Sequence, residues 1–137
     1  MAYEAYHPLY LRGVAHFNRG DFFESHEVWE DLWRKESGGS RQFYKGLIQA
    51  AVALYHLTRG NRHGAAKLLA GSQSCLEPYR SRYLGLDVDG FLAALGRCVE
   101  IALDSAAVGG GRPGAVDATT IPRIRLHPPP SAQQGGL

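Results

Sequence analysis

The sequence places a histidine and a glutamate four residues apart, at His26 and Glu30, in an acidic segment that also contains two tryptophans. On a helix, side chains four residues apart lie on the same face and can meet. An imidazole and a carboxylate in this arrangement can share a divalent metal ion, and a buried carboxylate can act as a general base. These two residues are therefore the first candidates for chemistry.

The helix that must carry this pair is predicted over residues 21–35. Laid out at about 100° per residue, it has an apolar arc around Trp29 and Trp33. His26 falls inside this arc and Glu30 beside it, so both are expected on the buried side. Burial of an unpaired carboxylate is costly, and we therefore expect Glu30 to be paired, metal-bound or protonated.

The following helix, predicted from a cap at Ser40 to about Arg59, supplies a possible complement. It is apolar nearly all round, as expected of a central helix. Its polar residues fall in one narrow stripe, which consists of Gln42, Lys45, Gln49 and His56. If this stripe faces the preceding helix, it forms a pocket with His26 and Glu30 whose predicted lining is Trp29, Trp33, Lys45 and Gly46. Gln49 and His56 are then the weaker candidates for a third metal ligand.

Two interpretations of this cluster remain open. The first is a metal-binding or small-molecule pocket, in which His26 and Glu30 hold a divalent metal ion. Two protein ligands are too few for a structural zinc site, and the segment lacks the second histidine of the metalloprotease helix signature. The second is a non-catalytic helical interaction module, in which the pair forms a buried structural network. Whether the protein is an enzyme is not decided by these residues, and a homo-oligomer is compatible with both.

Five helical segments are predicted to position the cluster. Each is bounded by a capping residue or by a glycine, and no strand signal of comparable strength occurs. The starts are assigned to Pro8 after His7, Asp21 with Glu24 as a capping box, Ser40, Asn61 and Asp87. The predicted fold is all-α, a compact bundle of about five antiparallel helices.

The composition changes after the fifth helix. Residues 108–137 are rich in glycine and proline, which is typical of a flexible or extended tail. We therefore predict a helical bundle domain over residues 1–107 and a C-terminal tail over 108–137. Within the tail, residues 121–126 alternate apolar and basic side chains, and we expect this stretch to lie along the bundle as an extended arm.

The composition also argues against several classes of partner. The 137 residues include 15 basic and 13 acidic side chains, for a net charge of +2, and no clustered basic face for nucleic acid stands out. No apolar stretch reaches the roughly 18 residues of a membrane span, and no signal peptide is visible. A cytoplasmic protein is expected, with Cys75 and Cys98 as small core residues rather than a disulfide framework.

The motif formed by His26, Glu30 and Trp33 resembles the signature of a known family, the domain of unknown function family 309. The approach to the motif over residues 17–24 and the later run over 46–51 are also similar to that family. The resemblance extends over about residues 9–95 and rests on these features in combination. It implies an all-helical fold and a metal-binding role for the histidine and the glutamate, without an assigned reaction, and it does not extend to the tail.

Overall fold

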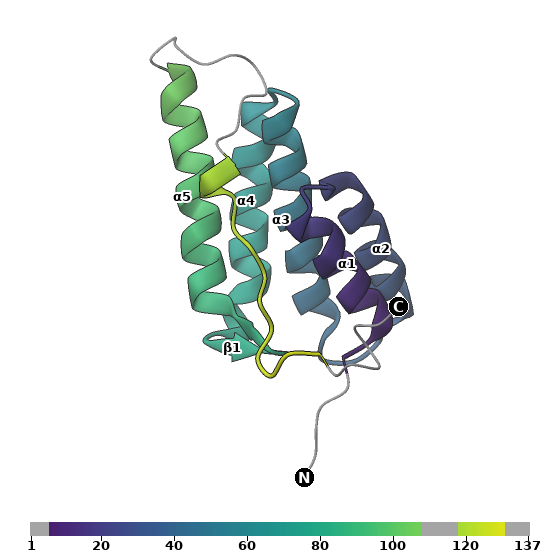
Figure 1. Ribbon diagram of the computed structural model, residues 1–137. Helices are drawn as coiled ribbons and strands as arrows, with labels where there is room; N and C mark the ends of the chain where they lie inside the picture. Colours follow the sequence, from purple (N-terminus) through teal and green to yellow (C-terminus); the bar gives the residue numbers. More distant parts are fainter. Residues whose placement is uncertain (1–5, 108–117, 131–137) are drawn as a thin grey trace.

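The computed structural model describes residues 6–107 and 118–130. Within these residues five α-helices follow one another: α1 (Pro8–Asn18), α2 (Phe22–Lys35), α3 (Arg41–Thr58), α4 (Arg62–Leu76) and α5 (Val88–Ala107). Two short 3-10 helices, η1 (Glu77–Tyr79) and η2 (Ala118–Thr120), respectively follow α4 and precede the extended C-terminal segment. The α-helices form an antiparallel bundle (Figure 1), which confirms the predicted all-α fold. A two-stranded antiparallel ladder, β1 (Arg82–Tyr83) and β2 (Leu86–Asp87), joins α4 to α5 and was not predicted. No helix in these two ranges has the length and apolarity needed to cross a membrane.

Several of the predicted helix boundaries rest on the expected capping chemistry. Pro8 opens α1, where its missing N–H costs nothing, and the His7 imidazole accepts a hydrogen bond from the Leu9 amide at 3.0 Å. Asn61 Oδ1 caps α4 by accepting from the Gly64 amide at 2.9 Å. The local sequence therefore fixes where these helices begin.

Two other predicted caps are wrong in their chemistry, although α2 and α3 begin where expected. Asp21 precedes α2 but its carboxylate makes no capping hydrogen bond, so the predicted capping box with Glu24 does not form. Asp21 Oδ2 instead lies 3.4 Å from Arg19 Nε. Ser40 precedes α3, and its hydroxyl is hydrogen-bonded to the Tyr83 hydroxyl at 2.6 Å. In both cases a nearby side chain competes successfully with the helix terminus.

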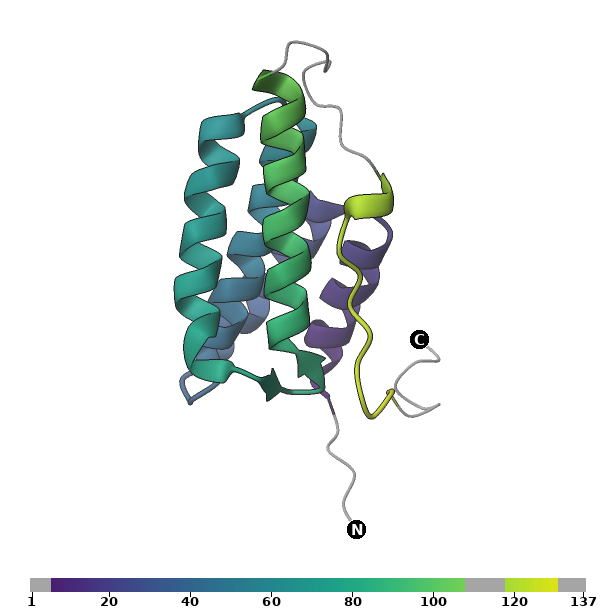
Figure 2. The same ribbon diagram turned by 90° about the vertical axis from the view of Figure 1, so that its left-hand side faces the viewer.

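The helices pack as two hairpins side by side, α1 with α2 and α3 with α4, and α5 closes against α4 and α3 (Figures 1 and 2). Trp29 of α2 is fully buried and lies against Gly13 of α1. Its indole N–H donates to the Tyr10 carbonyl at 3.2 Å, so the one polar atom of this ring is satisfied inside the core. Trp29 is therefore a structural anchor of the α1–α2 hairpin.

The space between α1 and α5 is filled by an extended segment, residues 121–128, which we call the arm (Figures 1 and 2). Ile124 and Leu126 are only 3% and 6% exposed and belong to the same hydrophobic core as the helices. The side-chain amide of Asn18 makes two hydrogen bonds with the main chain of Ile124. It donates to the Ile124 carbonyl at 2.9 Å and accepts from the Ile124 amide at 2.8 Å. The expected placement of the arm along the bundle is thus confirmed. The rest of the predicted tail, apart from residues 118–120 and 129–130, lies outside the described residues.

Candidate functional site

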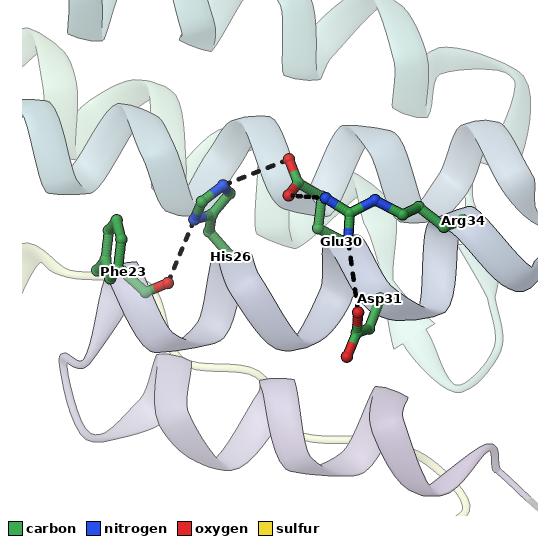
Figure 3. A network of polar contacts seen from close by, with 5 residues as sticks. All are labelled: Phe23, His26, Glu30, Asp31 and Arg34. Atoms are coloured by element: carbon green, nitrogen blue, oxygen red, sulfur yellow. Dashed lines mark hydrogen bonds and ion pairs between the residues drawn. The ribbon is translucent and has the colours of Figure 1, made fainter.

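His26 and Glu30 are neighbours on α2, as their spacing predicts (Figure 3). His26 Nε2 lies 3.5 Å from Glu30 Oε2, and His26 Nδ1 lies 3.3 Å from the Phe23 carbonyl oxygen. The other carboxylate oxygen of Glu30 accepts a hydrogen bond from Arg34 at 2.9 Å, and Arg34 also reaches Asp31 at 3.4 Å. The pair is therefore part of a short chain of polar contacts along one edge of the helix.

The prediction that this pair is buried is wrong. The side chain of His26 is 21% exposed and that of Glu30 is 36% exposed. The face that α2 buries is narrower than the apolar arc suggested, because the fully buried side chains are Phe22, Ser25, Trp29 and Leu32. His26 and Glu30 border this face, where Arg34 pairs with the carboxylate and water can solvate it. The partly exposed carboxylate of Glu30 consequently does not need a metal ion to compensate for burial.

A small apolar hollow lies beside His26, at the edge between α2 and α3. It has a volume of about 160 Å³ and is lined by Phe22, Phe23, His26, Val52, Tyr55 and His56. The ring of Phe23 is 44% exposed, although its centre lies 5.6 Å from that of Tyr55 and 5.5 Å from that of His26. The hollow thus joins two imidazoles to an aromatic surface that water can reach.

Of the two weaker candidates for a third ligand, the structure brings only His56 to this hollow. Its Nδ1 lies 3.3 Å from the side-chain amide nitrogen of Asn61, the residue that caps α4. Gln49 points elsewhere: its amide packs against Gly71 of α4, where a Cβ atom would come within 2.9 Å of Oε1. Its buried Oε1 has no hydrogen-bond partner within the described residues.

The polar stripe of α3 therefore faces α4 more than α2. The predicted pocket required this stripe to face α2, so the pocket does not form as predicted. Gln42 Nε2 contacts Cys75 Sγ at 3.9 Å, and Gly46 lies directly beneath Leu76, whose side chain occupies the position a Cβ would take. Ser72 donates to the Gly46 carbonyl at 2.8 Å. The small residue at position 46 lets α4 approach α3 closely, and this contact sets the rotation of α3.

None of the four residues predicted to line the pocket lies in the hollow. Trp29 is core against α1, and Gly46 is covered by α4. Trp33 is half-buried under the guanidinium of Arg41, which lies 3.8 Å from the ring centre. Lys45 is half-buried and makes no ion pair with Glu30, whose partners within the described residues are His26 and Arg34.

The structure adds four lining residues that the sequence did not single out for the pocket, Phe22, Phe23, Val52 and Tyr55. Phe23 falls on the flank of the apolar arc, which was the one available signal. Val52 and Tyr55 become lining residues only through the rotation of α3. Within the described parts of the chain, no three His, Cys, Asp or Glu side chains come close enough together to hold a metal ion. A metal held by His26 and Glu30 would therefore take its remaining ligands from water or from a bound molecule.

Comparison with known proteins confirms the resemblance drawn from the motif. The model of the family described as "Domain of unknown function (DUF309)" matches residues 10–68, which cover α1 from Tyr10, α2, α3 and the first half of α4. An uncharacterized protein of Bacillus subtilis, YpuF, is 41% identical over 70 residues, and an uncharacterized protein of Aquifex aeolicus is 32% identical over 74 residues. These alignments span 49% and 50% of this chain but only 40% and 22% of the relatives. The chain therefore matches less than half the length of either relative.

Proposed function

We propose that His26 and Glu30 form a small, solvent-accessible metal-binding site and that the adjoining hollow receives part of the molecule that completes the coordination. The location is part of the proposal as well: we place this site in a cytoplasmic protein, as the sequence predicts. The proposal rests on one observation, the way in which the two side chains face each other.

In the tautomer that carries its proton on Nδ1, the imidazole donates to the Phe23 carbonyl and presents the lone pair of Nε2 to Glu30 Oε2 at 3.5 Å. Two acceptors that face each other need a cation between them, which is either a proton on Nε2 or a metal ion. Two ligand atoms bound to one tetrahedral zinc ion at about 2.0–2.1 Å are separated by about 3.4 Å. The observed spacing is compatible with either cation.

The surroundings of the pair support a metal ion that exchanges ligands. The Phe23 carbonyl fixes the orientation of the imidazole, as outer partners of metal-binding histidines commonly do. Partial exposure of both side chains leaves room for water and for a ligand. A bound divalent ion would supply a Lewis acid at the edge of the hollow. His56 and the ring of Tyr55 would then contact the bound molecule.

The first experiment is elemental analysis of protein purified without chelator, followed by calorimetric titration with Zn²⁺ and Mn²⁺. We expect near-stoichiometric metal in the parent protein, and loss of metal in His26→Ala and in Glu30→Gln with the helical circular dichroism retained. His63→Ala is the matched control, because His63 is exposed on α4 and outside the hollow. Equal metal content in the control and in the two site variants would refute the proposal.

Arg34 provides a second and sharper test. Its guanidinium holds Glu30 Oε1 at 2.9 Å, so its positive charge opposes a metal ion on the other carboxylate oxygen. Arg34→Ala is expected to raise the metal affinity several-fold, with a larger effect at low ionic strength. Unchanged affinity in this variant would mean that the metal binds elsewhere.

A second function, a non-catalytic interaction surface, is favoured by the exposure of Phe23. An aromatic side chain that is 44% exposed beside an apolar hollow is a common feature of contact surfaces. Under this interpretation His26 serves only to support the Phe23 ring. Phe23→Ala would then abolish self-association in sedimentation velocity and leave the metal content unchanged. A metal site instead predicts that His26→Ala loses the metal and leaves self-association unchanged.

A further inference from the structure

The exposed side of the arm brings together cationic groups that are far apart in the sequence. Because Pro122, Ile124 and Leu126 are buried, the intervening Arg123, Arg125 and His127 face outward. They border a hollow of about 300 Å³ between the arm and the beginning of α5, to which β1 adds Arg82. We call this the arginine hollow; its remaining lining residues are Leu86, Asp87, Gly90, Phe91 and Ala94.

The charges in the arginine hollow are only partly balanced from within it, because three guanidinium groups face the single carboxylate of Asp87. Elsewhere Arg19, Arg34 and Arg80 are each paired with a carboxylate. Over residues 6–107 and 118–130, by contrast, no ion pair involves Arg82, Arg123 or Arg125. Three guanidinium groups beside one carboxylate leave an excess of positive charge, so an anion bound among the arginines would relieve their mutual repulsion.

The single carboxylate in the hollow is already engaged. Asp87 Oδ1 accepts from the Gly90 amide at 3.0 Å and so caps α5. The first amides of α5, Val88 and Asp89, donate to the Ser81 carbonyl at 2.8 and 3.3 Å. The backbone at this helix end is therefore satisfied. The guanidinium groups are the donors that remain for a ligand, although Arg82 Nη1 also donates to the Gly85 carbonyl at 3.5 Å.

We propose that the arginine hollow binds the phosphate group of a small phosphorylated molecule. Guanidinium groups recognise phosphate oxygens through paired N–H donors, a geometry that an ammonium group cannot provide. The volume is at the lower end of the range for small-molecule sites, which suits a phosphate with a small organic body against Leu86, Phe91 and Ala94. This proposal does not depend on the metal site, which involves different residues on α2.

The same ligand would hold the arm in place, because two of the three arginines belong to the arm and the third to β1. The arm is fixed independently of the ligand by Asn18 and by the His127 amide, which donates to the Gly85 carbonyl at 2.9 Å. An anion that bridges Arg82 to Arg123 and Arg125 adds a third link between the arm and the bundle. By linkage, binding must then lower the equilibrium population of molecules whose arm is detached.

The test is a calorimetric and NMR titration of the full chain with inorganic phosphate, pyrophosphate and adenosine monophosphate, in parallel with a single-stranded oligonucleotide. We expect saturable binding of at least one of the small phosphates and slower exchange of the Ile124 and His127 amides in its presence. Arg82→Gln and Arg123→Gln are each expected to weaken binding about tenfold, the loss expected for one charge-assisted hydrogen bond.

Arg62→Gln is the matched control, because Arg62 is exposed on α4 and outside the arginine hollow. Circular dichroism verifies that each variant keeps its helices. The proposal is overturned if none of the small phosphates binds at about 1 mM, or if the control weakens binding as much as the two site variants. Binding of the oligonucleotide alone would also overturn it, since that result would indicate a basic surface for nucleic acid.

Discussion

At the scale of single residues, the contact between Trp29 and Gly13 determines how closely α1 and α2 approach. The indole ring occupies the position that a side chain at residue 13 would take, so that an added Cβ would lie 2.0 Å from Trp29 Nε1. Because the ring is fully buried and its N–H is bonded to the Tyr10 carbonyl, it has no room to turn aside. The glycine is thus required by packing rather than by backbone conformation.

Gly13→Ala is expected to lower the free energy of unfolding by about 2–3 kcal/mol, the cost of overpacking a tight core. Urea denaturation followed by tryptophan fluorescence measures the change. Gly39→Ala is the control, because nothing lies within 4 Å of a Cβ built at that position. If both variants unfold at the same urea concentration, the close approach of α1 and α2 is contradicted.

Two buried tyrosines make the stability dependent on alkaline pH. Burial, reinforced by the nearby Glu36 and Tyr83, raises the pKa of Tyr44 to about 12. Burial also raises the pKa of Tyr10, whose hydroxyl donates to the Leu84 carbonyl at 3.0 Å. In the unfolded chain both phenols ionise near pH 10, whereas in the folded protein they stay neutral. Their contribution to stability is therefore complete below about pH 10 and is lost as the pH rises towards 12.

We expect the free energy of unfolding to fall by about 2 kcal/mol per pH unit between about pH 10 and pH 11, because each of the two tyrosines contributes up to about 1.4 kcal/mol per unit. Urea titrations between about pH 8 and pH 11 measure this slope. Tyr44→Phe should make the slope shallower, since phenylalanine has no proton to lose. An unchanged slope in this variant would show that Tyr44 ionises at the same pH in the folded and unfolded states.

At the scale of elements, the arm is attached to α1 mainly through its main chain. Asn18 is the last residue of α1, and its amide group bonds both the N–H and the carbonyl of Ile124, as a neighbouring strand would do. The Tyr6 hydroxyl donates to the Pro128 carbonyl at 2.5 Å near the far end of the arm. One side chain thus supplies the paired hydrogen bonds that an extended segment needs.

Asn18→Ala removes both of these bonds and leaves the amide and carbonyl of Ile124 without a partner. We expect a loss of about 2–3 kcal/mol in the local stability of the arm. Amide exchange measured by NMR should accelerate at Ile124 and His127 by more than tenfold. Exchange within α3 should stay the same, and a uniform acceleration in all helices would contradict a local role for Asn18.

How far the sequence predicted this molecule differs between its elements. The helix boundaries followed from local chemistry, because capping at Asn61 and proline at the start of α1 involve residues close in sequence. The alternation in residues 121–126 likewise predicted the arm, since buried and exposed side chains alternate as in a strand. These features needed no knowledge of distant contacts.

The candidate site was predicted less well because it depends on the rotation of one helix. The i, i+4 spacing correctly placed His26 beside Glu30. The identity of a third ligand beside His26 and Glu30 depended on which face of α3 meets α2. The close contact of Gly46 with Leu76 of α4 fixes that rotation of α3. Similarly, the arginine hollow joins Arg82 to the arm through the return of the chain past α5, which no local pattern predicts.

At the scale of the whole molecule, the core extends beyond the segment that the family model matches. The family model ends at residue 68, within α4. Buried side chains of α5, such as Phe91 and Leu95, and of the arm belong to the same core as those of α1 to α4. Phe91 lies against Phe17 of α1, with ring centres 5.8 Å apart. Helix α5 and the arm, which lie outside the family match, therefore contribute buried side chains to the core formed by α1 to α4.

Ile124→Ala tests this contribution of the arm. A buried isoleucine truncated to alanine usually costs about 2–5 kcal/mol, and we expect a loss in this range with a lower melting temperature. Ile101→Ala is the matched control, because Ile101 lies on α5 and is 39% exposed. If the two variants were equally stable, the arm would have no part in the cooperative core.

The way in which Asn18 holds the arm has a consequence for how new binding properties can arise in this molecule. Because Asn18 contacts only main-chain atoms of Ile124, the side chains at positions 123 and 125 are not needed for docking. They can be exchanged for acidic, aromatic or polar groups while the arm keeps its path between α1 and α5. Positions 123 and 125 of the arm can thus be substituted to change which ligand binds, while the helices and the buried core stay as they are.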